Sequence, residues 1–122
     1  MPDTLIPRTG SAYDYPLLVK RLLFHPVVDN PEQEIVYRYL HRYTYRDLHL
    51  RVQRLANALT GLGIGRGDTV AVMDWDSHRY LECFFAVPMI GAVLHTINVR
   101  LSPEQILYTI DHAEDDALLV NS

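Results

Sequence analysis

The stretch TVAVMDWDSHRYLECFFAVPMIGAVLHTINVRLSPEQILYTIDHAEDDALLV, residues 69–120, decides the fold of this chain. Three short apolar runs lie within it, at residues 69–73, 92–97 and 117–120, and two longer segments with helical patterns separate them. The first run is continuously apolar after Thr69, which is typical of a strand buried on both faces of a parallel sheet. The order therefore predicts an α/β fold with a parallel β-α-β-α-β unit joined by right-handed crossovers.

Both segments between the strands begin with helix-start signals. Asp76 or Ser77 is expected to cap the first helix, and Gly91 is expected to stop it. This helix is apolar around nearly its whole circumference, so we expect it to be deeply buried. The second helix is predicted to start at SPEQ, residues 102–105, where serine is the cap, proline takes the first position and glutamine closes a capping box.

A short helix and a β-hairpin are predicted ahead of this unit. The helix is expected to follow Pro16 and to end at a loop that Pro26 and Pro31 bracket. Residues 34–45 are rich in aromatic and β-branched side chains, and this composition predicts a hairpin with its turn near His41.

An amphipathic helix is predicted between the hairpin and the first parallel strand. Thr44 and Asp47 resemble a capping box, with aspartate where glutamate or glutamine is usual. The glycines of residues 61–67 end the helix and form a turn. One apolar stripe runs along the helix, with spacings of 4, 3, 4 and 3, and comprises Leu48, Val52, Leu55, Leu59 and Leu62.

Length and composition fit one globular domain. The chain has 122 residues, 48% of them hydrophobic and 21% charged, which argues against disorder and coiled coil. Residues 1–15 have little periodicity and are expected to form an extended arm, and residues 16–122 are expected to form a partial domain. The net charge of −4 argues against nucleic-acid binding, and no apolar run reaches the roughly 18 residues of a membrane span.

A single cysteine excludes an internal disulfide and a cysteine-based zinc cluster, and it favours a reducing, cytoplasmic location. The start of the chain lacks the basic-then-apolar layout of a signal peptide. Lys20 is the one lysine beside ten arginines, which removes most lysine-dependent chemistry.

Asp74 and Asp76 follow a predicted buried strand, where open α/β sheets bind ligands. Two carboxylates there could bind Mg²⁺, or one could accept a phosphoryl group, and the run looks like the first motif of haloacid-dehalogenase-type phosphotransferases. Such enzymes also need a downstream lysine, which is absent, and the acidic pair Asp115-Asp116 precedes a strand instead of following one. The alternative is that this turn only caps a helix.

The remaining polar residues favour structural roles. The glycines of residues 61–67 follow a helix and precede a strand, which is the reverse of a dinucleotide-binding loop. His95 lies inside an apolar strand and is expected to be a satisfied core histidine, and Cys83 is expected to be an inert core thiol. The tyrosines and arginines of residues 37–45 favour a packed hairpin over a nucleic-acid stacking surface.

Three stretches together resemble one family. They are residues 44–72, with TYRDL and LGIGRGDTVAV at its ends, residues 84–98, and residues 100–116. The phrase AVLHTIN followed by RLSPE is the most distinctive part. The chain resembles the N-terminal region of the adenylate-forming (AMP-binding) enzymes, specifically the medium- and long-chain fatty acyl-CoA synthetases, from about residue 15 onward.

The resemblance implies an enzyme that activates a carboxylic acid with ATP and Mg²⁺ to an acyl-adenylate and then passes the acyl group to coenzyme A. The catalytic motifs of such enzymes lie downstream of this region: the phosphate loop ending in Pro-Lys, the Thr-Glu segment, the ribose-binding Asp and the C-terminal Lys. We therefore assign no catalytic, cofactor-binding or metal-binding residue to this chain, and expect it to bind no cofactor alone.

Three functions follow as hypotheses. The first is an N-terminal fragment of a fatty acyl-CoA synthetase, inactive alone, whose partners are the remainder of the synthetase and a fatty acid. The second is a Mg²⁺-dependent phosphotransferase built on Asp74 and Asp76. The third is a non-catalytic interaction module that uses residues 1–25 and the hairpin. Exposed apolar surface on the helix of residues 77–90 and an open strand edge at residues 117–120 predict that residues 1–122 form a dimer or larger, or are poorly soluble.

Overall fold

The computed structural model describes residues 9–121, and residues 1–8 of the predicted arm lie outside them. Its centre is a parallel sheet of three strands in the order β4-β3-β5. These strands are β3 (Thr69–Met73), β4 (Val93–Thr96) and β5 (Ala117–Val120). Val70 of β3 lies opposite Leu94 on one side and Ala117 on the other. The predicted β-α-β-α-β unit is confirmed.

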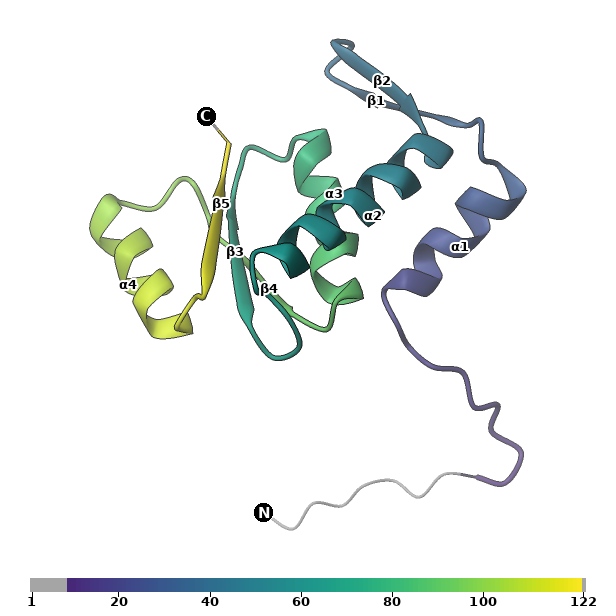
Figure 1. Ribbon diagram of the computed structural model, residues 1–122, viewed down its shortest axis with the longest axis horizontal. Helices are drawn as coiled ribbons and strands as arrows, with labels where there is room; N and C mark the ends of the chain where they lie inside the picture. Colours follow the sequence, from purple (N-terminus) through teal and green to yellow (C-terminus); the bar gives the residue numbers. More distant parts are fainter. Residues whose placement is uncertain (1–8, 122) are drawn as a thin grey trace.

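Helices cover both faces of this sheet (Figure 1). One face carries α2 (Tyr45–Gly61) and α3 (His78–Met89), and the other carries α4 (Pro103–Ala113). Val70 and Val72 pack with Leu59 of α2 and Val87 of α3 in one buried cluster. Side chains alternate along a strand, so the fully buried Ala71 points to the α4 face. The core therefore sits mainly between β3, α2 and α3.

The N-terminal caps of α2, α3 and α4 are side-chain hydrogen bonds, as the sequence predicts. Thr44 and Asp47 form the capping box of α2, and Ser102 and Gln105 form that of α4. At α3 the cap is Ser77, whose Oγ accepts from the N–H of Arg79. We expected α3 to be buried on all sides, and this is only partly right. One face of α3 is buried, but Phe84 is exposed.

The hairpin is confirmed, but its turn lies before His41. The strands β1 (Glu34–Tyr37) and β2 (His41–Thr44) pair antiparallel, with Tyr37 opposite His41. The turn is residues 38–40, in which Arg38 and Tyr39 adopt positive φ of 48° and 59°. His41 is therefore the first residue of β2, and the hairpin forms a sheet of its own beside α2 and α3.

The first helix differs from its prediction. Helix α1 spans Lys20–Asp29 and contains Pro26, where a loop was expected. Leu23 before the proline and Val27 after it both pack against the cluster that α2 and α3 build, and this burial outweighs the hydrogen bond that proline cannot donate. Residues 9–19 form no helix or strand. On α2 the predicted stripe stops at Leu59, since Leu62 lies beyond the helix and is exposed.

Within residues 9–121, no helix is long and apolar enough to cross a lipid bilayer.

Candidate functional site at the carboxyl edge of the sheet

The loops that leave β3 and β4 turn to opposite faces of the sheet. The loop after β3 leads to α3 on one face, and the loop after β4 leads to α4 on the other (Figure 1). Ligands of open α/β sheets bind at such a switch point, outside the carboxyl ends of the strands. A hollow of about 350 Å³ occupies this place, which we call the switch-point crevice. Its walls are residues 74–76, Tyr80 and residues 96–100.

Asp74 links the loop after β3 to the end of β5 through hydrogen bonds. Its carboxylate accepts hydrogen bonds from the backbone N–H of Trp75 at 2.6 Å, from Nδ2 of Asn121 at 2.8 Å and from Oγ of Ser77. Burial raises the pKa of Asp74, but the hydrogen bonds from Ser77, Asn121 and Trp75 outweigh it and hold the pKa below its ordinary value. Asp74 is therefore an ionised carboxylate that ties the β3–α3 turn to the end of β5.

The structure places Asp74 and Asp76 in the wall of the switch-point crevice and Asp115 and Asp116 away from it. Asp76 is exposed in the crevice wall with φ of 56°, while the buried Asp74 makes the bonds just described. Asp116 lies at the other end of the sheet, where its Oδ2 accepts from the N–H of Thr69 at 2.8 Å. No group of three or more metal-ligating side chains occurs among residues 9–121. The phosphotransferase hypothesis therefore rests on Asp74 and Asp76 alone and stays a prediction.

His95 and Asp115 form a bonded pair on the α4 side. His95 Nδ1 lies 2.8 Å from Oδ2 of Asp115, whose side chain is 1% exposed. His95 thus has a partner, as expected, but its own side chain is 23% exposed and so is not fully in the core. Cys83 is also buried, and burial raises its pKa to about 11. Its thiol therefore stays protonated at neutral pH, in keeping with the inert role expected.

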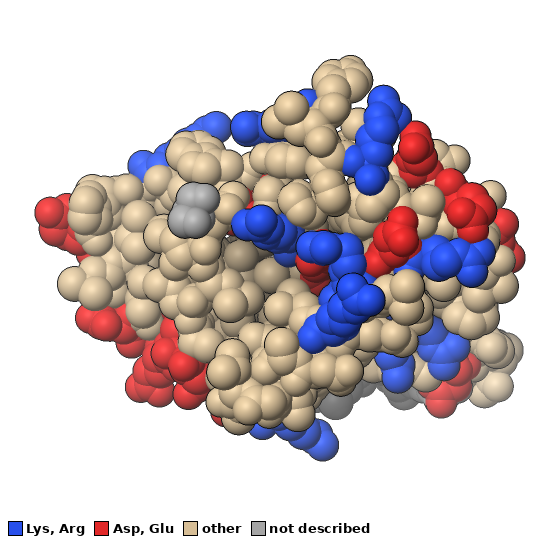
Figure 2. Space-filling model, turned by 45° about the horizontal axis from the view of Figure 1, so that its top comes forward, with Lys and Arg blue, Asp and Glu red and all other residues tan. Residues whose placement is uncertain are grey.

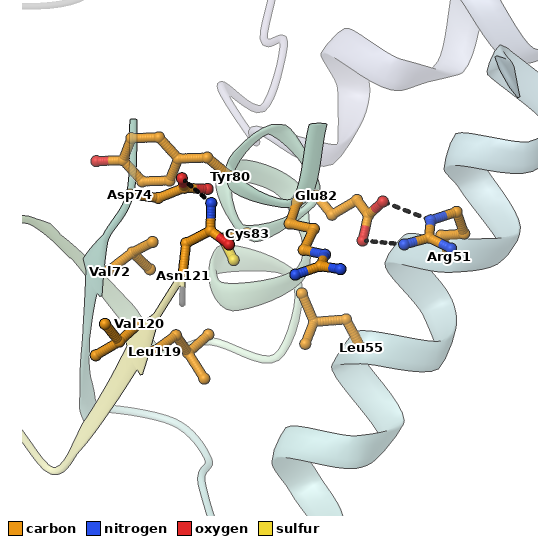
Figure 3. Close-up of a pocket in the computed structure, with 11 residues that line it drawn as sticks. Arg51, Leu55, Val72, Asp74, Tyr80, Glu82, Cys83, Leu119, Val120 and Asn121 are labelled. Carbon is orange, nitrogen blue, oxygen red and sulfur yellow. Dashed lines mark hydrogen bonds and ion pairs between the residues drawn. The ribbon is translucent and has the colours of Figure 1, made fainter. Parts of the chain in front are cut away.

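A second hollow, the α2–α3 pocket, lies on the other side of Asp74. It has a volume of about 230 Å³ and opens between α2, α3 and β5 (Figure 3). Leu55, Cys83 and Leu119 supply apolar walls, and the bonded Asp74 and Asn121 lie at one end. Charged side chains of α2 and α3 also line the pocket, and Figure 2 shows basic side chains beside acidic ones near the middle of the face that it draws. The pocket thus combines an apolar floor with a charged rim.

An ion pair that the sequence analysis missed lies at the rim of the α2–α3 pocket. Arg51 Nε lies 2.5 Å from Oε1 of Glu82, and Nη2 lies 3.3 Å from Oε2. The Glu82 side chain is 7% exposed and that of Arg51 is 39% exposed. The hydrogen bond to Glu82 raises the pKa of Arg51. The available signal was Glu82 itself, a lone carboxylate in the apolar run LECFFAV, which requires a partner when buried.

Curated relatives of the chain are acyl-CoA ligases. The chain is 51% identical over 80 residues to a long-chain-fatty-acid–CoA ligase of Thermus thermophilus, covering 66% of this chain and 15% of that protein. It is 33% identical over 117 residues to a 3-methylmercaptopropionyl-CoA ligase of Ruegeria lacuscaerulensis, covering 93% of this chain and 22% of that one. The chain thus spans less than a quarter of the length of either relative.

Solved structures show the same fold. A fatty acyl CoA synthetase of Mycobacterium tuberculosis superposes with a TM-score of 0.78 and 24% identity, over 84% of this chain and 21% of that one. The anthranilate CoA ligase AuaEII superposes with a TM-score of 0.80 and 24% identity, over 87% of this chain and 21% of that one. The arrangement of hairpin, helices and parallel strands is therefore that of the leading region of these enzymes.

The sequence pattern of the family described as AMP-binding enzyme matches residues 23–122, which is most of the chain. The match begins inside α1 and includes the hairpin, the parallel sheet and both hollows at its carboxyl edge. The resemblance drawn from the sequence is confirmed, and the chain belongs to the AMP-binding enzyme family.

Proposed function

We propose that this chain supplies the first part of the N-terminal domain of an acyl-CoA ligase. The reaction would join a fatty acid to coenzyme A through an acyl-adenylate, with ATP and Mg²⁺ supplied to the whole enzyme. The observation that carries the proposal is the 51% identity over 80 residues to a long-chain-fatty-acid–CoA ligase. A medium-chain-fatty-acid–CoA ligase of Ectopseudomonas oleovorans, 42% identical over 80 residues, supports the same substrate class.

This chain would contribute the structural framework of the N-terminal domain and the walls of the two hollows at the carboxyl edge of its sheet. Asp74 holds the carboxyl edge of the sheet in one shape, and the two hollows beside it offer surfaces to the remainder of the synthetase. The groups that bind phosphate, ribose and the reacting acid would come from that remainder. Residues 1–122 alone would then form no acyl-adenylate, because no residue in them is assigned to meet the charge that develops on the phosphate.

A chimera tests the proposal. The 80 aligned residues of the Thermus ligase would be replaced by those of this chain, and acyl-CoA formation would be measured with a long-chain fatty acid, ATP, Mg²⁺ and coenzyme A. We expect acyl-CoA from the chimera and from the unmodified ligase, and none from residues 1–122 alone. A chimera that melts like its parent but forms no acyl-CoA contradicts the proposal.

A further inference from the structure

Two histidines join the hairpin to the first turn of α3. His41 begins β2, and His78 is the first residue of α3. Their ring centroids are 4.2 Å apart and their planes are inclined by 34°. Tyr43 lies 5.1 Å from the ring of His41 and 6.0 Å from that of His78, and Tyr37 lies 5.6 Å from His78. We call these four side chains the imidazole cluster.

The cluster holds polar atoms without partners. Among residues 9–121, three buried side-chain nitrogen or oxygen atoms make no hydrogen bond, and all three belong to it: Nε2 of His41, Nδ1 of His78 and the hydroxyl of Tyr43. Tyr43 is 6% exposed. Buried polar groups normally have partners, and an unpaired one lowers stability. The hairpin is therefore docked on α3 at a contact that apolar packing maintains against an electrostatic cost.

The surroundings oppose a positive charge on His78. Burial lowers its pKa below the ordinary 6.5, the nearby His41 lowers it further, and Arg51 and Arg79 act in the same direction. Its position at the start of α3 adds the positive end of the helix dipole. Within residues 9–121, Glu82 is the one nearby group that raises the pKa of His78, and that carboxylate is already bonded to Arg51.

The two tyrosines supply no negative charge that would favour a protonated His78. Burial, followed by the charge of Glu82, raises the pKa of Tyr43 to about 12, so the phenol stays neutral. Tyr37, at the end of β1, lies against His78. The guanidinium carbon of Arg38 lies 5.4 Å from the ring centroid of Tyr37. The hydroxyl of Tyr43 therefore offers no negative charge to His78, and three of the four charged groups named around the cluster, Arg38, Arg51 and Arg79, are cations.

We propose that the His41–His78 contact is a proton-operated latch, closed while the His78 ring is neutral against His41 and opened when His78 takes up a proton. Opening would release β1 and β2 from α3 and leave the parallel sheet intact, because the hairpin shares no strand pairing with that sheet. The segment that moves would carry Thr44, the cap of α2, at its end. The latch would thus couple proton uptake to the packing of the hairpin.

The direction in pH follows from His78. A histidine whose pKa is lowered in the docked state stabilises docking above its ordinary value of 6.5. That stability is lost as the pH falls from there toward the lowered pKa. Between these two pKa values, the equilibrium constant for docking falls about tenfold per pH unit for each proton taken up.

Hydrogen exchange of residues 1–122 tests the latch. Protection factors of the amides in residues 34–44, corrected for the intrinsic pH dependence of exchange, would be measured between about pH 7.5 and about pH 5. We expect a fall of about tenfold per pH unit in the hairpin below pH 6.5, with the amides of β3 unchanged. His78→Gln removes the titrating ring and should flatten the profile. His41→Gln removes a neighbour that lowers the pKa of His78 and should reduce the slope of the profile. His112→Gln, at an exposed site on α4, is the matched control and should keep it.

Ring titration by NMR of the unaltered chain completes the test, and it does not depend on the folding of any variant. The midpoint of His78 should lie below 6.5 and coincide with the loss of hairpin protection. Hairpin protection that is flat across this range overturns the proposal. So does a full pH-dependent loss in a folded His78→Gln protein.

Discussion

Replacing Arg51 with methionine is expected to destabilise the fold through the carboxylate that it leaves behind. Methionine keeps an unbranched stem and a similar helix propensity, so the change removes mainly the guanidinium. Glu82 would remain in the core of α3 with its side chain 7% exposed and without the two bonds that Arg51 donates. The expected loss of unfolding free energy comes from this unpaired charge.

Two limits bracket the size of the loss. Breaking a fully buried ion pair costs about 3–5 kcal/mol, and breaking an exposed pair costs about 0–1 kcal/mol. Arg51 is 39% exposed, so water partly screens its charge, while Glu82 is nearly inaccessible. We therefore expect a loss of about 2 kcal/mol, between the two limits.

Urea denaturation followed by far-UV circular dichroism would measure this loss. The matched control is Arg46→Met on the same helix, which breaks a pair with Glu32 whose side chains are 60% and 71% exposed. It should cost about 0.5 kcal/mol or less. Adding Glu82→Gln to the Arg51 variant should recover part of the loss by removing the unpaired charge. Equal losses in the Arg51 and Arg46 variants would refute the reasoning.

Three further predictions concern the core, the thiol and association. Val87→Ala, at a fully buried site, should cost about 2 kcal/mol by thermal or urea unfolding, while Val93→Ala, at a site that is 54% exposed, should cost far less. Cys83 should react with a thiol reagent at pH 8 at least about a hundredfold more slowly in the folded chain than in urea, because its pKa is about 11; equal rates would count against a buried thiol. Light scattering should find residues 1–122 as a dimer or larger, since Leu17 and Leu22 are 95% and 71% exposed; a monomer at high concentration would oppose this. If the arm makes the contact instead, deletion of residues 1–15 should weaken association.

The parallel unit was predictable because its signals are local. Each strand lies in a short, mostly apolar run, and Ser102 through Gln105 specify a helix start within four residues. The position of the hairpin turn was not predictable in this way. Arg38 and Tyr39 adopt the left-handed conformation that glycine or asparagine usually marks, so the turn carries no sequence signal.

The parts that the sequence missed depend on contacts between distant residues. Helix α1 continues through Pro26 because Val27 finds a packing surface built by α2 and α3. Arg51 and Glu82 are 31 positions apart, and only the packing of α2 on α3 brings them together. Asp74 was recognised as a residue of interest, yet its role depends on Asn121, which is 47 positions away. No local pattern specifies such partners.

Pyrophosphate release tests the central claim most directly, namely that this chain is a scaffold region whose enzyme needs residues outside it. Purified residues 1–122 would be incubated with ATP, Mg²⁺ and a long-chain fatty acid, with the unmodified Thermus ligase as the positive control. If the claim holds, residues 1–122 give no release above a protein-free blank. Sustained release from them, proportional to protein concentration, would contradict it.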